Sequence, residues 1–473
     1  MKSINKTIFK NTSYLLISDV GIRLISTAAI IYLARYLGPD GYGIYSVAFS
    51  FSCVFGFLTS MGFGQTFLRE HTKENANSSA LVASLLKIKL CLAFFATILA
   101  LILIPILYVD EPLRSVAYVV VVPVLWGTAL SDFGVIYFVS IQKMKYVALI
   151  RATLSLIQAG LLVCGIFLGW TLQEVAVAPG AGSLLSGLLA FVLVKRHLGQ
   201  FSGWHSSLLP GVTLFTVAGL ISTLMPQMAP LILEKVSSIN EVGNFSAVYR
   251  VPLLFMALPS AIASAFYPQL FNYGHTDKQK HFQLYLHELR YMHFISIGMA
   301  LPVTLYSDWI VKILFGADWA QSGVVLSIVV WCIVIQSLNI PLADSLTTQG
   351  LQSARVKVLV TVVLLGGVMY FLLGTHFGAP GAAITVVAIE ALALVGYLFC
   401  NPRKWELVRH GMIGFSQTCC GLLFSVTICY LLPVNYEIVG LVLAPLLFYV
   451  FMFVFARFRS DVTILCKYVK GSR

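Results

Sequence analysis

Charged side chains inside long apolar stretches are the residues of this sequence that could do chemistry. Asp19 and Arg23 lie four residues apart, so a helix would place both on one face. Arg250 has no acidic residue four positions away, and its guanidinium group is a planar fork of donors that fits a pyrophosphate. We therefore predict that Arg23 and Arg250 line a site for an anionic ligand and that Asp19 tunes Arg23. Two structural alternatives stay open: an Asp19–Arg23 pair that only holds helices together, and a pair of Arg250 with Asp132 or Glu390.

The other candidates are acidic residues and lysines. Glu390 falls near the middle of an apolar stretch, where a carboxyl group is either a proton or sodium site or a buried hydrogen-bonding group. Asp344 is a second ion-coupling candidate and Asp132 a further ligand-binding candidate, unless each only bonds a neighbour. Lys87 and Lys89 lie near a predicted helix end, where they would extend to the head-group region or form a rim that collects an anionic head.

No motif for a metal or a nucleotide accompanies these charges. The nine cysteines lie mostly inside apolar stretches and form no metal-like cluster, so we expect them to be small packing residues. No Gly-rich loop ends in Lys-Ser or Lys-Thr, as a site for ATP phosphates would require. We therefore expect no cofactor, no metal and no enzymatic activity, while coupling to H⁺ or Na⁺ stays open.

The elements that position these residues are apolar stretches long enough to cross a bilayer. Hydrophobic residues make up 59% of the 473 residues and charged residues only 11%. About 20 apolar residues cross about 30 Å of hydrocarbon as a helix, and continuous apolar runs favour helices over a barrel. The sequence thus predicts an all-α polytopic membrane protein. Its expected spans are 12–34, 44–66, 80–106, 115–138, 147–170, 175–194, 208–233, 243–271, 291–314, 323–346, 356–375, 380–400, 412–432 and 438–458, about 14 transmembrane helices.

Basic residues set the expected orientation. An even number of spans puts both termini on one side, and that side collects most of the 31 Lys and Arg residues. The other side keeps Arg35, Arg114, Lys235 and Lys312 among mostly acidic breaks. Because basic residues accumulate on the cytoplasmic side, both termini are predicted to be cytoplasmic. The net charge of +12 then reflects topology and contact with anionic lipids, with no need for nucleic acid.

Weak internal symmetry divides the chain. Residues 38–46 and 237–246 share a glycine, a variable residue, an aromatic residue and a serine, preceded in each case by an acidic residue, at an offset of 200. A second echo relates 140–145 to 347–352 at an offset of 207. We predict a six-helix lobe at 1–200, a second six-helix lobe at 201–400 and two appended helices with a cytoplasmic tail at 401–473, a known transporter plan.

Polar breaks and prolines complete the predicted organisation. The longest polar break is expected at about 272–290. Prolines remove a backbone donor and kink helices, so kinks are expected in spans 208–233 and 243–271. These kinks suit either rocking of the lobes or static packing. The prolines concerned are Pro226, Pro230, Pro252, Pro259 and Pro268.

The residues after the first span resemble a family signature. Leu33-Ala34-Arg35-Tyr36-Leu37-Gly38-Pro39-Asp40-Gly41-Tyr42-Gly43-Ile44-Tyr45 is similar to the opening signature of bacterial polysaccharide-biosynthesis membrane proteins, which are O-antigen and exopolysaccharide flippases of the multidrug/oligosaccharidyl-lipid/polysaccharide superfamily. The segment Glu241–Ser246, Tyr267-Pro268 and Leu314-Phe315-Gly316 resemble the same family. The resemblance implies two helical lobes around a central cavity in a bacterial plasma (inner) membrane. It also implies translocation of polyprenyl-pyrophosphate-linked oligosaccharide to the external leaflet, with a polysaccharide polymerase and a chain-length regulator as further partners.

Other functions remain as alternatives to such a flippase working by alternating access. A cation-coupled multidrug exporter or a lipid II flippase would belong to the same superfamily. The cation-coupled exporter would need a net acidic cavity, whereas Arg23 and Arg250 favour an anionic cargo. A membrane glycosyltransferase or polymerase would need an acidic metal-binding motif or a large external loop, and the sequence has neither. A scaffold without transport would not need charges inside its spans.

Overall fold

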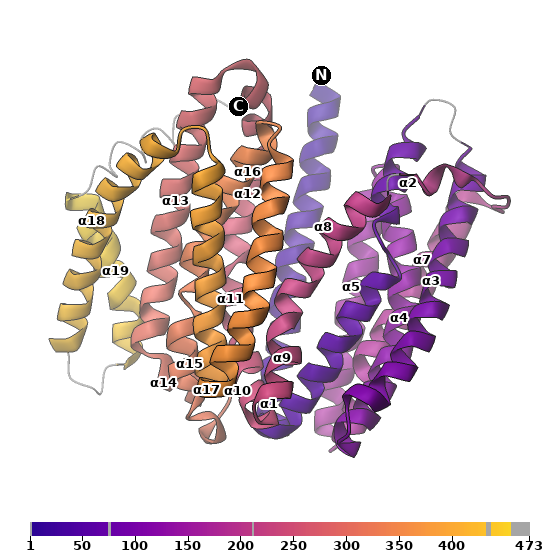
Figure 1. Cartoon of the computed structure of the whole chain (residues 1–473), viewed down its shortest axis with the longest axis horizontal. Helices are drawn as coiled ribbons and strands as arrows, with labels where there is room; N and C mark the ends of the chain where they lie inside the picture. Colours follow the sequence, from indigo (N-terminus) through magenta and orange to yellow (C-terminus); the bar gives the residue numbers. More distant parts are fainter. Residues whose placement is uncertain (1, 74–76, 211, 432–436, 456–473) are drawn as a thin grey trace. The chain divides into compact units, whose positions relative to one another are not determined.

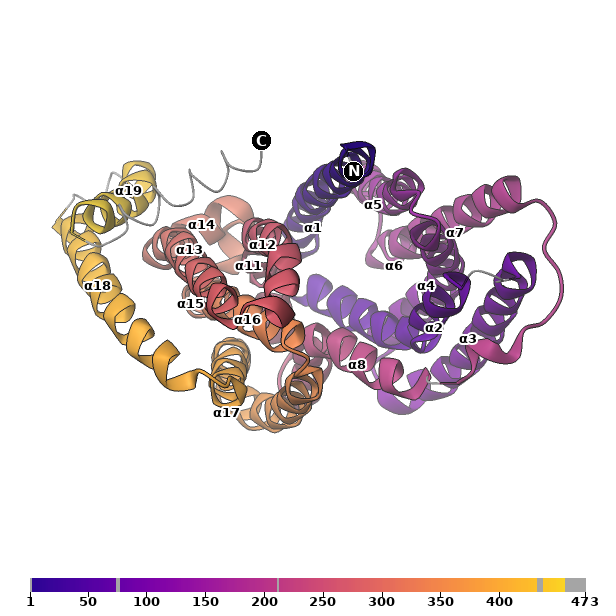
Figure 2. The ribbon, with the colours of Figure 1, turned by 90° about the horizontal axis from the view of Figure 1, so that it is seen from above.

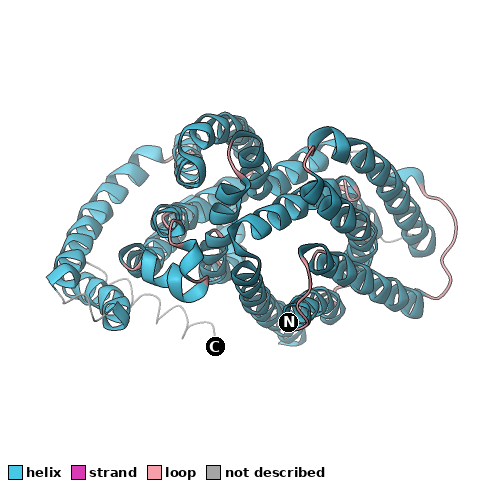
Figure 3. Ribbon diagram, turned by 90° about the horizontal axis from the view of Figure 1, so that it is seen from below, coloured by secondary structure: helices cyan, strands magenta, loops and turns pink. Residues whose placement is uncertain are grey.

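The computed structural model describes residues 2–73, 77–210, 212–431 and 437–455, and these are helices joined by short connections (Figures 1 and 3). No strand occurs in these ranges. The chain divides into two compact units, Met1–Ala247 and Val248–Arg473. This division follows packing, whereas the predicted boundary near residue 200 follows the sequence repeats, so the lobe limits stay a prediction.

The first unit is a helical bundle in which α1 packs against α4 and α5, and α4 lies between α3 and α7 (Figure 2). Its elements are α1 (Lys2–Leu58), α2 (Phe63–His71), α3 (Ser78–Leu107), α4 (Glu111–Ser140), α5 (Met144–Phe167), α6 (Leu172–Val175), α7 (Val177–Leu198), the 3-10 turn η1 (Ser206–Leu208), α8 (Val212–Leu224), the 3-10 turn η2 (Met225–Gln227), α9 (Met228–Val236) and α10 (Ile239–Val248).

In the second unit α13 packs against α12, α16 and α19, and α16 packs against α17. Its elements are α11 (Arg250–Phe255), α12 (Ala257–Thr276), α13 (Lys278–Leu305), α14 (Ser307–Leu314), the 3-10 turn η3 (Ala317–Trp319), α15 (Ser322–Val329), α16 (Cys332–Thr348), α17 (Gln352–Cys400), α18 (Lys404–Leu431) and α19 (Glu437–Phe455). The chain turns by 79° between α13 and α14.

The predicted polytopic helical fold is confirmed. Eight helical segments of the described residues are long and apolar enough to cross a membrane, or nine if α13 and α14 form one bent span. Two of these segments each hold two predicted spans, because the helix bends sharply in the middle: α1 at Gly38 (φ 67°) and α17 at Gly378 (φ 59°). Each bend needs a left-handed backbone conformation, which glycine adopts without a steric penalty. Every one of the fourteen predicted ranges falls on helix within the described residues.

The predicted polar break at 272–290 is helical in the structure for all but one residue. Helix α12 continues to Thr276 and α13 begins at Lys278, so a single residue, Asp277, separates them. The Asp277 carboxylate accepts hydrogen bonds from the backbone N–H groups of Gln279 and Lys280, both 3.0 Å away, and so caps α13. These backbone donors hold the pKa of Asp277 below its usual range. Polarity had indicated a loop, whereas a capped helix carries the same polar residues.

The kinks predicted at prolines are present. The span 208–233 is interrupted by η2 around Pro226, and the span 243–271 breaks at Tyr249 and at Met256. A proline ring clashes with the carbonyl group four residues earlier. The breaks follow directly after Val248 and Phe255, which stand four residues before Pro252 and Pro259. Whether the kinks serve rocking stays a prediction.

The second sequence echo corresponds to one turn built twice. At the end of α4 the N–H groups of Ile141, Gln142 and Lys143 bond the carbonyl oxygens of Tyr137, Val139 and Phe138. At the end of α16 the N–H groups of Gln349, Gly350 and Leu351 bond those of Ser345, Thr347 and Leu346. Gln142 and Gly350 both have positive φ, 57° and 80°. The structural offset is therefore 208, one residue more than the sequence comparison predicted.

The two copies of the first sequence echo, residues 38–46 and 237–246, contact each other in the structure. Both copies lie in the first unit. A Cβ atom on Gly43 would lie 2.1 Å from the carbonyl oxygen of Ile239, and one on Gly243 would lie 1.9 Å from that of Pro39. Asn240 Nδ2 donates to Asp40 Oδ1 at 3.1 Å beside these contacts. Pro39 and Ile239 are equivalent positions at the offset of 200. The two glycines therefore make the same contact, each with the other motif. The two motifs form a reciprocal contact that only residues without a side chain allow.

This contact predicts a coupled response to mutation. Gly43→Ala and Gly243→Ala should each lower the free energy of unfolding by about 1–3 kcal/mol, because a methyl group would push α1 and α10 apart. Separation of the helices relieves both clashes, so the double variant should lose less than the sum of the single losses. Thermal unfolding of the purified protein in detergent measures this.

Gly160→Ala is the matched control. A Cβ atom there would meet nothing within 4 Å, so alanine in α5 should leave stability unchanged or raise it slightly. Strict additivity of the Gly43 and Gly243 effects would contradict a shared contact.

Candidate functional site

Asp132 belongs to a polar cluster inside the first unit. Its Oδ2 atom accepts a hydrogen bond from Ser60 Oγ at 2.6 Å, and Ser60 Oγ accepts one from Lys89 Nζ at 2.9 Å. Lys89 Nζ also lies 3.7 Å from Asp132 Oδ2. The three residues come from α4, the turn between α1 and α2, and α3. The cluster therefore ties three segments together through one carboxylate oxygen.

The two lysines of α3 behave in opposite ways. Lys89 is fully buried, so the prediction that it extends toward the head groups is wrong. Lys87 is exposed, and its Nζ donates to the carbonyl oxygen of Gly203 at 3.1 Å. A buried ammonium group costs several kcal/mol unless it is paired, and the Asp132 carboxylate supplies that pairing. The proposed role of Lys87 at a rim stays a prediction.

Small residues set the position of Asp132. Helices α4 and α7 share the most extensive helix–helix contact in the chain. A Cβ atom on Gly127 would lie 2.3 Å from the Ser183 carbonyl carbon, and one on Gly134 would lie 2.6 Å from the Ala190 Cβ. Such residues let membrane helices approach closely. Helical geometry then turns Asp132 away from α7, and its side chain is 48% exposed.

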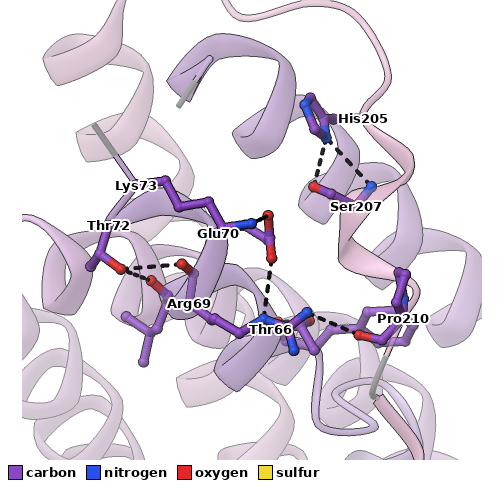
Figure 4. A network of polar contacts seen from close by, with 10 residues as sticks. Thr66, Arg69, Glu70, Thr72, Lys73, His205, Ser207 and Pro210 are labelled. Atoms are coloured by element: carbon purple, nitrogen blue, oxygen red, sulfur yellow. Dashed lines mark hydrogen bonds and ion pairs between the residues drawn. The ribbon is translucent and has the colours of Figure 1, made fainter. Parts of the chain in front are cut away.

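A second network fastens α2 at its C-terminal end (Figure 4). Arg69 Nε and Lys73 Nζ contact the two carboxylate oxygens of Glu70 at 3.1 and 2.5 Å. Arg69 Nη2 also donates to the carbonyl oxygen of Pro210 at 3.0 Å. Glu70 thus holds two basic side chains, and Arg69 links α2 to the segment that leads into α8.

In the second unit Glu390 is held by a single amide. Asn339 Nδ2 of α16 donates to Glu390 Oε2 at 2.7 Å and to the Glu390 carbonyl oxygen at 3.0 Å. Cys332 and Tyr370 lie near enough to feel the charge of Glu390. The carboxyl group of Glu390 is therefore hydrogen-bonded, and its role as a proton or sodium site stays a prediction.

Asp344 is paired with a cation. Its Oδ1 atom lies 3.7 Å from Arg355 Nη1, and the same nitrogen donates to Thr347 Oγ1 at 2.9 Å. This places Asp344 near the C-terminal end of α16, where α17 begins. Its ion-coupling role stays a prediction, now with a defined partner.

The predicted arginines are placed less completely. Arg250 opens α11 beside Tyr249, is half-buried, and acts electrostatically on that tyrosine. Asp19 and Arg23 lie on α1, but their side chains are outside the described residues. The anion-binding role of these residues stays a prediction.

Sequence reasoning missed Glu288. This residue lies in α13 and is fully buried, yet it falls in the segment expected to be a polar break. The signal that could have found it is the apolar spacing of Phe282, Tyr285, Leu289 and Met292, which is helical and runs through the polar residues.

The bundle and its internally paired charges define a polytopic helical membrane protein with the fold of lipid flippases and multidrug transporters. The fold is similar to that of a structure titled "Lipid II flippase MurJ, inward closed conformation", with a TM-score of 0.76, 15% identity and coverage of 93% of this chain and 98% of the other. It is also similar to an inward-facing multidrug resistance MATE family transporter of the MOP superfamily, with a TM-score of 0.65, 15% identity and coverage of 82% and 96%.

The chain belongs to the polysaccharide biosynthesis protein family, whose model matches residues 8–273. The resemblance carried by residues 33–45 is thereby confirmed. A protein of Escherichia coli (strain K12) named as an O-antigen transporter is 25% identical over 403 residues, covering 81% of this chain and 94% of that protein. A relative from Shigella flexneri with the same name is 24% identical over 421 residues, covering 82% and 97%.

The Lys89–Asp132 cluster predicts an asymmetric response to mutation. Asp132→Ala should lower the free energy of unfolding by about 3 kcal/mol, because it leaves a buried ammonium group without its carboxylate. Water at the half-exposed carboxylate reduces this figure. Lys89→Met should cost less than about 1 kcal/mol, since it removes the charge that is expensive to bury. Thermal unfolding in detergent compares the two.

Lys87→Met is the control on the same helix. Its side chain is exposed, so stability should change by less than about 0.5 kcal/mol. Equal losses for Asp132→Ala and Lys89→Met would show that Lys89 is not the costly member of the pair.

Proposed function

We propose that this protein is a flippase that moves polyprenyl-pyrophosphate-linked oligosaccharide repeat units from the cytoplasmic to the external leaflet, for the synthesis of a surface polysaccharide such as O-antigen, capsule or exopolysaccharide. The observation that carries the proposal is membership of the polysaccharide biosynthesis family over residues 8–273. Relatives named as O-antigen transporters match most of the chain. A shorter match, 23% identical over 157 residues, is to a protein of Haloferax volcanii named as a low-salt glycan biosynthesis flippase.

The mechanism that we propose is alternating access. The anionic pyrophosphate and first sugars enter a polar interior from the cytoplasmic side, and the polyprenyl chain stays in lipid. Arg250 and Arg23 bind the pyrophosphate, Asp19 tunes Arg23, and Lys87 attracts the head group at the rim. Because Ser60 and Lys89 both engage Oδ2 of Asp132, the Oδ1 atom is the one suited to accept a sugar hydroxyl.

The membrane potential supplies part of the driving force in this scheme. Moving one elementary charge across the membrane changes its free energy by about 2.3 kcal/mol per 100 mV of membrane potential. The interior of a bacterial cell is negative, so outward movement of an anionic head is favourable. Coupling to a proton or sodium ion through Glu390 or Asp344 adds to this force but is not required by it.

The setting follows from the same proposal. The protein lies in a bacterial plasma (inner) membrane with both termini cytoplasmic, as the distribution of Lys and Arg indicates. It acts as a transporter and not as an enzyme. A polysaccharide polymerase and a chain-length regulator are its proposed partners, since translocated repeat units must be joined and their number controlled.

An Arg250 series tests the proposal in a strain that lacks the chromosomal copy. Arg250→Ala should abolish surface polysaccharide while the amount of protein in the membrane holds. Arg250→Lys should restore it in part, because an ammonium group keeps the charge but not the planar fork. Polysaccharide staining and immunoblotting of membranes measure the two quantities.

Lys357→Ala is the control, since Lys357 is an exposed cation of the second unit. Normal polysaccharide with Arg250→Ala would remove Arg250 from the binding site. Normal polysaccharide in the strain that lacks the protein, together with new sensitivity to cationic drugs, would favour the multidrug exporter instead.

A further inference from the structure

Glu288 is a buried acidic residue of α13 in the second unit. Its side chain has no solvent exposure, and neither carboxyl oxygen has a hydrogen-bond partner among the described residues. An isolated carboxylate in such surroundings costs many kcal/mol, far more than a neutral carboxylic acid. The site is therefore stable only when the carboxyl group carries a proton or a bound cation.

A graded path connects this group to the end of the bundle. Asp344 lies on α16, the helix that packs against α13, and its Oδ1 atom lies 3.7 Å from Arg355 Nη1. Exposure of the side chains falls along this series, from 37% for Arg355 to 15% for Asp344 and to none for Glu288. The end of α16 that holds Asp344 is the one predicted to be cytoplasmic. The three residues thus lead from water into the interior.

Helix α16 continues the polar path. Ser337 lies seven residues before Asp344, which places both on one side of the helix. Its Oγ atom is buried and has no partner among the described residues. Asn339, on another side of α16, bonds Glu390. The helix that packs against α13 therefore carries a buried hydroxyl group without a partner among the described residues, in addition to the amide that bonds Glu390.

The chemistry of the site favours a proton over a metal cation. A metal ion needs several oxygen or nitrogen ligands, and the described residues contain no group of three His, Cys, Asp or Glu side chains placed to hold one. A proton needs a single carboxyl oxygen.

We propose that Glu288 is a proton-binding site that exchanges with the cytoplasmic side through Asp344. A proton from water binds the Asp344 carboxylate, then passes to the Glu288 carboxylate, so that Glu288 becomes neutral and Asp344 regains its negative charge. No electron is transferred. Arg355 is a positioning residue that stabilises Asp344 when Asp344 is charged. That this proton drives transport rests on the proposed function; the site itself does not.

Other ionisable groups lie close to Glu288 on α13 itself: His287 and Arg290 within two residues along the chain, and Tyr285 and Tyr291 one helical turn away on either side. The elements that pack against α13 are α12, α14, α15, α16, α18 and α19. Among them α16 carries Asp344, the acidic residue of the proposed route. On α13 itself, His281 contacts Thr348 Oγ1 at 2.8 Å and His293 contacts Thr418 Oγ1 at 3.0 Å. These histidines already have partners elsewhere.

Infrared difference spectroscopy of the purified full-length protein tests the site without any lipid-linked substrate. The wild-type protein at neutral pH should show the C=O stretch of a protonated carboxyl group, and this band should be lost in Glu288→Gln. Glu406→Gln is the matched control, because Glu406 is exposed in the same unit, and it should keep the band. In Asp344→Asn the band should remain, but its shift on transfer to D₂O should slow at least tenfold.

Three results would overturn the proposal. One is a wild-type protein without the band, a measurement that does not depend on any variant folding. Another is a band that disappears when sodium is added at constant pH, which would assign a cation site. The last is an unchanged rate of deuterium shift in Asp344→Asn. Loss of polysaccharide with Arg250→Ala tests the flippase function separately, so either conclusion can fail alone.

Discussion

The cost of placing charge in hydrocarbon governs the polar structure of this protein. Each charge inside a span costs about 2.5–3.5 kcal/mol even on the mildest scales, so a partner or the loss of the charge by protonation is needed to offset that cost. The Lys89 ammonium group is paired with Asp132, the Asp344 carboxylate with Arg355, and Glu390 is bonded by Asn339. In each of these pairs the two residues come from two different helices. The pairs therefore fix which helices lie side by side, in addition to the packing of small residues between α4 and α7.

The family assignment agrees with this arrangement without depending on it. The fold likeness to lipid II flippases and multidrug transporters defines how the helices are laid out. The family match places the chain among polysaccharide biosynthesis proteins. The ionisable residues that lack a complete set of hydrogen-bond or ion-pair partners are then the candidates for a function. Glu288 is such a charge in the second unit, whereas Asp132 in the first unit is already neutralised through one oxygen.

Hydrophobic patterning predicted the helices well, because a bilayer imposes a minimum apolar length that is visible in a single sequence. It also predicted the bends at Gly38 and Gly378 as breaks between spans. It failed at residues 272–290, where a helix extends beyond its apolar part and polarity no longer distinguishes helix from loop. It failed for Lys89 and Glu288 for another reason. The position of a charge along one helix is readable from sequence, but its distance to a group on a neighbouring helix is not.

The interlocked glycines at Gly43 and Gly243 bear on how the chain arose. Gly43 approaches Ile239 while Gly243 approaches Pro39, so the two equivalent glycines contact two equivalent residues, each in the other motif. This exchange of equivalent contacts is the pattern of an isologous interface in a two-fold homodimer. A gene duplication that fused two such identical subunits would leave this pattern behind.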